Sequence, residues 1–184
     1  MAAVQYATAE IDPPRPLATL SLGGAGKKWP AAEVPALLEA VCRQVLQRGT
    51  DPLIEASFAE GLKAGTATVR DVVFSLSLTD LYTEKFGAPG RPREAVEHAY
   101  RRLLAREAEP AGLGYWAPIC EKQGLAQVLR GHATSGEYVN RFGNDRVPFP
   151  PPAAAAHESL FMKVVKTAVK VGTQIVAGRS AQRK

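Results

Sequence analysis

The amino-acid sequence predicts an all-α fold: a single compact multi-helix domain, with an extended N-terminal arm before it and a C-terminal amphipathic helix after it. Proline repeatedly stands near the expected start of a helix and glycine near its end, which is the asymmetry that helix termini show. Between these boundaries apolar side chains recur every three or four residues, and no segment has the pattern of a β-hairpin. We expect the arm over residues 1–30, the domain over 31–150 and the tail over 151–184.

The first two helices are predicted from an apolar face and from boundary residues. A helix over about residues 36–47 would place Leu37, Leu38, Val41 and Val45 on one face, with Gly49 ending it. In a second helix Asp51 serves as the N-cap and Pro52 occupies the first turn. The apolar residues of this helix are Ile54, Phe58 and Leu62, and Gly65 ends it.

Two shorter helices should follow, each beginning at a threonine. Thr68 and Asp71 have the spacing of a capping box, with Asp in place of the usual Glu. The buried residues of this helix would be Val69, Val72, Val73 and Leu76. Thr79 then caps a segment that contains Leu81, Tyr82 and Phe86 and ends at Gly87 and Pro89.

Four further helices complete the predicted domain. Pro92 begins one that contains Val96, Tyr100, Leu103 and Leu104. Pro110 begins another, in which Leu113, Trp116, Ala117 and Cys120 share a face until Gly124. The next has the apolar stripe Leu125, Val128 and Leu129. Ser135 caps the last, in which Tyr138 and Phe142 lie one turn apart and Gly143 is the end.

The segment after the domain differs from it in composition and charge. Prolines 148, 150, 151 and 152 remove backbone donors and favour an extended chain, so we expect the domain to end there. Residues 151–184 hold six basic residues and one acidic residue, whereas residues 1–150 hold 17 of each. The net charge of +5 therefore belongs to the tail. This argues against nucleic-acid binding by the domain, because such domains usually carry basic clusters on the folded body.

The sequence gives no positive indication of catalysis or of a metal site, and we expect no enzyme. Gly23 to Lys28 is glycine-rich, but a Walker A motif would need glycine at Ser21 and a hydroxyl residue at Lys28. His98, His132 and His157 lack partners at metal-binding spacing. The N-terminus lacks the pattern of a signal or transit peptide, and no apolar run reaches the roughly 20 residues of a membrane span.

Several short motifs, in order along the chain, resemble the phycobilisome linker domain that rod and rod-core linkers share. They are Ala40 to Val45, Val69 to Asp71 with Leu76, Thr79, Asp80 and Tyr82, Leu103 to Arg106, Gln123-Gly124, Ser135 to Tyr138, Phe142 to Asp145, and Val147 to Phe149. The family usually has Leu-Gly-Arg where this chain has Leu104-Ala105-Arg106. The residues that carry the resemblance are Arg43, Gln44, Arg70, Asp71, Tyr82, Arg106, Glu137, Tyr138, Phe142 and Gly143.

This resemblance implies a helical domain seated in a phycobiliprotein hexamer, where it joins discs and adjusts the environment of the bilins that its partners carry. We expect no cofactor of its own and no nucleic acid. The layout of one domain and a short extension is similar to that of rod-core linkers, which reach the allophycocyanin core. A rod linker or rod-terminal linker is the alternative. The expected location is peripheral, on the cytoplasmic or stromal face of the thylakoid membrane.

The tail and the cysteines leave alternatives open. An apolar stripe from Phe161 to Ile175 opposes three lysines, so the tail fits either a groove in a partner protein or an anionic lipid surface. The candidate contact residues are Phe161, Lys163, Val165, Lys166 and Lys170. Some gamma-type linkers carry bilins on cysteine, but Cys42 and Cys120 lie on apolar faces and are expected to be buried thiols. Arg70 and Asp71 are expected to support the fold, with partner contact as the alternative, and Tyr82, Tyr138 and Trp116 are expected in the core.

Overall fold

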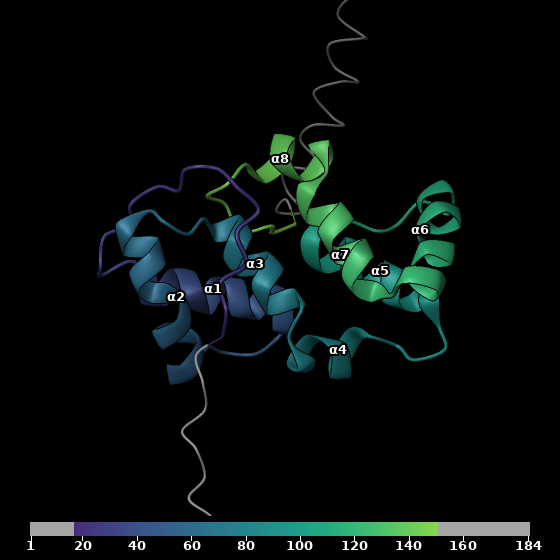
Figure 1. The fold of residues 1–184 in the computed structure, drawn as a ribbon, viewed down its shortest axis with the longest axis horizontal. Helices are drawn as coiled ribbons and strands as arrows, with labels where there is room; N and C mark the ends of the chain where they lie inside the picture. Colours follow the sequence, from purple (N-terminus) through teal and green to yellow (C-terminus); the bar gives the residue numbers. More distant parts are fainter. Residues whose placement is uncertain (1–16, 151–184) are drawn as a thin grey trace, which may run out of the picture. The chain divides into compact units, whose positions relative to one another are not determined.

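A computed structural model describes residues 17–150 of the chain. In this range it contains eight α-helices and no β-strand, which confirms the all-α prediction (Figure 1). The helices are α1 Val34–Leu46, α2 Pro52–Ala64, α3 Val69–Ser77, α4 Asp80–Phe86, α5 Pro92–Leu103, α6 Pro110–Gln123, α7 Leu125–Thr134 and α8 Gly136–Phe142. The predicted tail helix and the first part of the arm lie outside the described residues. None of the described helices is long and apolar enough to cross a membrane.

Four helices begin at the residues that the sequence predicts. The Asp51 carboxylate accepts a hydrogen bond from the Ile54 N–H at 3.0 Å, and the Thr68 hydroxyl accepts one from Asp71 at 3.0 Å. Asp71 in turn accepts from the Thr68 N–H, so the capping box is complete. Thr79 and Ser135 cap α4 and α8 in the same way. Each cap satisfies a donor that the first turn leaves without a helical partner.

The first helix departs from the predicted bounds at both ends. It was expected over about residues 36–47 with Gly49 as its end, but it runs from Val34 to Leu46. Gln47 adopts the left-handed conformation (φ 53°) that ends it. The Lys85 ammonium of α4 donates to the carbonyls of Leu46 and Gln47 at 3.1 and 3.4 Å. A side chain distant in sequence therefore satisfies the end of α1, which local spacing could not reveal.

The helices within residues 17–148 form two packed groups that share one core. In the first group α1 packs against α2 and α3, and in the second α5, α6 and α7 pack against one another (Figure 1). Contacts of α3 with α7, and of α4 with both α1 and α5, join the groups. The largest fully buried side chains include Tyr82, Tyr138, Phe58 and Leu38. Apolar burial of this kind is the main stabilising contribution to such a fold.

Residues 17–24, which we call the strap, have neither helical nor strand structure. Leu17 and Leu22 of the strap are partly buried against the core. The N–H of Leu17 donates to the Ser57 hydroxyl of α2, so the described part of the predicted arm is attached to the domain.

Candidate interaction surface

Arg70 and Asp71, from the first turn of α3, hold the strap. One Asp71 oxygen accepts the Leu22 N–H at 2.7 Å, while the other completes the capping box with Thr68. The Arg70 guanidinium donates to the Gly23 carbonyl at 2.7 Å. Both side chains are buried. Both motif residues thus make contacts within the domain, and these contacts reach a segment almost 50 residues away in the sequence.

Arg106 and Glu137 form the centre of an ionic cluster between the α5–α6 connection and α8. Two guanidinium nitrogens of Arg106 meet the two Glu137 oxygens at 2.5 and 2.7 Å, and Arg106 also contacts Glu109. Arg141 donates to Glu137 at 3.1 Å and to the Leu104 carbonyl at 2.5 Å. Hydrogen bonds from Arg106 lower the pKa of the Glu137 and Glu109 carboxyls, which favours their charged forms.

Gln44 and Arg43 are neighbours in one motif but have different environments. The buried Gln44 amide donates to the carbonyls of Arg101 and Arg102 at 3.2 and 3.0 Å, and so satisfies the end of α5. The Arg43 side chain is 71% exposed and pairs with Glu39. Exposed pairs of this kind contribute little stability, so Arg43 remains available at the surface.

The aromatic motif residues lie inside the domain. Tyr82 and Tyr138 are fully buried, and burial raises the pKa of both phenols. Phe142 stacks edge-on against Tyr138 with ring centroids 5.2 Å apart, and Gly143 follows it with a positive φ of 62° that ends α8. The core placement expected for the two tyrosines is confirmed. Trp116, expected in the core as well, is only partly buried.

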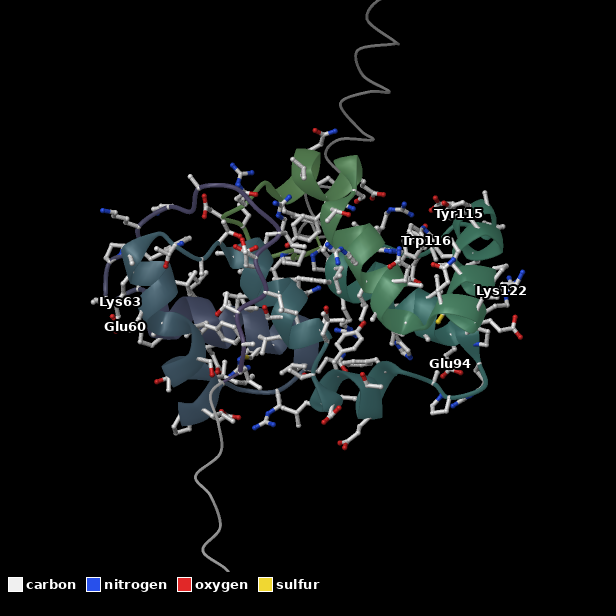
Figure 2. All side chains as sticks on the ribbon, viewed as in Figure 1. Glu60, Lys63, Glu94, Tyr115, Trp116 and Lys122 are labelled. Carbon is white, nitrogen blue, oxygen red and sulfur yellow. The ribbon has the colours of Figure 1, made fainter. Side chains whose placement is uncertain are left out.

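The outward face of α6 is the exposed surface that sequence reasoning missed. Tyr115, labelled on α6 in Figure 2, is 63% exposed. Its neighbours on this face, Ala111, Gly114 and Pro118, are exposed as well. Pro118 has no N–H, so the Gly114 carbonyl lacks its helical donor, and Gly114 has no side chain to cover it. The face thus combines an aromatic ring, small residues and a carbonyl without its helical donor. In the sequence, the only sign of this surface was Pro118, a proline inside an otherwise helical pattern.

Tyr115 connects this face to a row of aromatic rings that leads into the core. Its ring lies edge-on to Trp116 at 5.0 Å, and Trp116 lies 5.0 Å from His132. His132 in turn contacts Tyr100 at 4.5 Å. Trp116 also lies directly over Gly131, where an added Cβ would stand 2.2 Å from the indole. The base of the α6 face is therefore tightly packed, which holds Tyr115 in position.

The two cysteines, and the two histidines within residues 17–150, show no metal-binding or nucleophilic arrangement. Burial raises the pKa of the Cys42 thiol to about 11 and raises that of Cys120, which disfavours the nucleophilic thiolate at both positions. Cys42 is buried as expected, whereas Cys120 is only partly buried. Residues 17–150 contain no group of three His, Cys, Asp or Glu side chains that could hold a metal ion. His157 and the five candidate contact residues of the tail lie outside the described residues.

Comparison with known proteins identifies a matching family and relatives that are similar in sequence. Residues 29–150 match the family model described as "Phycobilisome Linker polypeptide". The phycobiliprotein ApcE of a Synechocystis strain is 31% identical over 128 residues, which cover 68% of this chain and 14% of that protein. The phycocyanin-associated 32.1 kDa rod linker polypeptide of Mastigocladus laminosus is 30% identical over 122 residues, which cover 64% of this chain and 42% of the relative. The chain thus spans less than half the length of both relatives.

Proposed function

Because the chain belongs to the phycobilisome linker polypeptide family, we propose that it is a structural linker that sits in a phycobiliprotein hexamer and connects a rod to the allophycocyanin core. In this role it adjusts the environment of the partner's bilins for energy transfer, and it lies at the periphery of the thylakoid surface. The family match over residues 29–150 carries the proposal, since that range includes all of α1–α8.

The motif residues support a scaffold rather than an enzyme. Four motif residues make polar contacts that join one part of the domain to another, namely Gln44, Arg70, Asp71 and Glu137. Catalytic groups, by contrast, must face a substrate within hydrogen-bond reach. We therefore assign this chain no reaction, and place its activity in the surfaces that it presents to other proteins.

The α6 face around Tyr115 is the surface that we assign to the phycobiliprotein. Exposed aromatic residues are typical of the central part of protein interfaces, where they fill pockets of the partner. The Gly114 carbonyl, which lacks its helical donor, offers an acceptor on this face, so a partner that supplies a donor there fits it best. A phycobiliprotein subunit with an apolar pocket and a neighbouring donor fits both requirements.

A binding measurement with phycocyanin hexamers tests this assignment. Tyr115→Ala should weaken binding by about tenfold or more, as expected for an aromatic residue at the centre of an interface. Leu81→Ala, at an exposed apolar residue of α4, is the matched control and should bind normally. Failure of the unmodified chain to bind any phycobiliprotein would refute the linker role. Normal binding by Tyr115→Ala would refute only the α6 assignment.

We assign binding of the allophycocyanin core to the tail, because the tail carries the excess of positive charge. Its apolar stripe would enter a groove while Lys163, Lys166 and Lys170 meet acidic side chains. Phe161 and Val165 belong to the stripe. Removal of residues 157–184 should leave hexamer binding intact and abolish attachment to allophycocyanin. Attachment by the truncated chain would overturn the rod-core role and favour a rod or rod-terminal linker.

A membrane contact is the second candidate for the tail, because basic amphipathic segments bind anionic lipid. Flotation of the full chain with vesicles containing phosphatidylglycerol distinguishes lipid binding by the tail from binding to allophycocyanin. Lipid binding that disappears with residues 157–184, without any allophycocyanin binding, would support the membrane contact. Allophycocyanin binding without flotation would support the core.

We also propose that the linker carries no bilin of its own. The raised pKa values of Cys42 and Cys120 disfavour thioether formation at either sulfur. Zinc-enhanced fluorescence of the denatured polypeptide, purified from its native source, tests this. A dark band is expected, and a fluorescent one would overturn the proposal.

A further inference from the structure

Side chains of α2 and α3 contact the backbone of the strap. The Leu20 N–H donates to the Ser75 hydroxyl at 2.8 Å, and the Leu22 N–H donates to Asp71 at 2.7 Å. Arg70 donates to the Gly23 carbonyl at 2.7 Å. These contacts, together with the Ser57 hydroxyl that accepts from Leu17, involve backbone groups of the strap and not its side chains. These polar contacts suit the backbone of an extended segment, and the partly buried Leu17 and Leu22 side chains add apolar contact with the core.

The spacing of these contacts matches an extended peptide that runs antiparallel to α3. Two residues of an extended chain span roughly 6.6 Å, and four residues of a helix rise about 6 Å. Leu20 and Leu22 are two residues apart, and their acceptors Ser75 and Asp71 are four residues apart in the opposite direction. Alternate N–H groups of the strap therefore meet one acceptor per turn of α3. The Thr19 and Ser21 N–H groups, which lie between them, have no partner among the described residues.

This register leads to a proposal that goes beyond the linker role. We propose that Ser57, Arg70, Asp71 and Ser75 form a peptide-binding groove that accepts the strap sequence in trans, so that the strap of a second copy of the chain can replace the chain's own strap. The strap sequence is the occupant because it is the segment that the structure seats in the groove. Gly23 and Gly24, both with positive φ, form the C-terminal end of the strap, where the chain changes direction.

Exchange of this kind is governed by local concentration. A tethered strap competes at an effective concentration in the millimolar range, so an added peptide binds weakly while the strap of the same chain is in place. Reciprocal exchange between two copies fills both grooves with identical contacts, as in domain swapping. The groove must therefore be vacated before binding in trans can be measured.

Two double variants of the full chain make this measurement possible. Leu20→Pro/Leu22→Pro removes both N–H donors and should release the strap. Thr19→Pro/Ser21→Pro places prolines at the intervening positions and loses only the exposed 3.2 Å bond from Gly23 to Ser21, so its strap should stay in place. The probe is a fluorescein-labelled peptide with the sequence of residues 15–25, with a second peptide that carries proline at positions 20 and 22.

Tight binding is expected for only one combination of protein variant and peptide. The Leu20→Pro/Leu22→Pro chain should bind the unmodified peptide about tenfold or more tightly than the Thr19→Pro/Ser21→Pro chain does, and it should not bind the proline-containing peptide. Equal binding of both peptides, or binding of neither by a folded protein, would overturn the proposal. If the first variant loses its helical circular dichroism, amide hydrogen exchange of the unmodified chain decides. The Leu20 and Leu22 amides should then exchange more slowly than those of Thr19 and Ser21, and equal rates would overturn the groove.

Discussion

The Arg106 guanidinium and the Glu137 carboxylate face each other with two parallel contacts, although 31 residues separate them in the sequence. They join the α5–α6 connection to α8, and the Arg106 guanidinium also stacks 4.7 Å above the Tyr100 ring. Bidentate pairing of this kind is stronger and more directional than an ordinary surface ion pair.

Glu137→Gln should destabilise the domain. The change removes the charge on which both Arg106 and Arg141 depend, and we expect a loss of about 1 kcal/mol in the free energy of unfolding, because the pair is about one-third exposed. Urea unfolding followed by circular dichroism measures it. Glu60→Gln is the matched control, since Glu60 is 85% exposed and among residues 17–150 pairs only with Lys63, and it should change stability by less than about 0.5 kcal/mol. Equal losses in the two variants would contradict the importance of the bidentate geometry.

Ala105→Gly should stabilise the domain. Ala105 has a φ of 49°, a left-handed conformation that costs a residue with a Cβ roughly 1 kcal/mol. The family's Leu-Gly-Arg pattern has glycine at this position, and the structure supplies the physical reason. Chemical denaturation should show a gain of about 1 kcal/mol. The same change at Ala56, an exposed helical residue of α2, should instead lose about that amount. A loss at both positions would show that the strain at Ala105 is negligible.

Acid should destabilise the domain partly through His132. Burial lowers its pKa to about 4 from 6.5, so the unfolded chain binds the proton at higher pH than the folded protein does. The free energy of unfolding therefore includes the full contribution of neutral His132 above pH 6.5. As the pH falls toward 4 this contribution is lost, and the free energy of unfolding falls by about 3 kcal/mol in total.

His132→Leu provides the test of this pH dependence. Thermal unfolding of both proteins at pH 7 and pH 4.5 should show a smaller acid-induced loss in the variant. The variant is needed for comparison because other groups also make the domain less stable in acid. These groups, whose pKa values are lowered too, are Glu109, Glu137 and His98. An identical pH dependence in the two proteins would exclude His132 as a contributor.

Pro118→Ala should make α6 more stable. The substitution restores the N–H that the Gly114 carbonyl lacks and removes a helix-breaking residue from an interior position, so the domain should gain about 1 kcal/mol or more. Pro110→Ala is the control, because a proline in the first turn displaces no helical hydrogen bond, and it should have little effect. If the Gly114 carbonyl contacts the phycobiliprotein, Pro118→Ala should also weaken hexamer binding.

Local features of the fold were predictable from the sequence, whereas long-range contacts were not. Asp51, Thr68, Thr79 and Ser135 cap helices through atoms three residues away, so short motifs were sufficient to locate those helix starts. The end of α1 depends on Lys85, which lies 39 residues beyond Leu46, and spacing alone predicted Gly49.

The candidate surfaces were harder to predict for the same reason. Arg106 and Glu137 were recognised as separate motif residues, but only the folded chain brings them together. Tyr115 was not singled out, because an exposed aromatic residue on a helix produces no periodic pattern of its own. The attachment of the strap was missed because serine hydroxyls that accept distant N–H groups leave no trace in sequence spacing.

The strap also affects the order of events during folding. Its contacts close sequence separations of 40, 49 and 55 residues, whereas the helix caps close separations of three. Long loops cost more entropy to close, so the strap should attach after the transition state has formed. Ser75→Ala should then accelerate unfolding and leave the refolding rate almost unchanged. The strap would then slow the unfolding of the domain, whereas the packing of the helices would determine the folding rate.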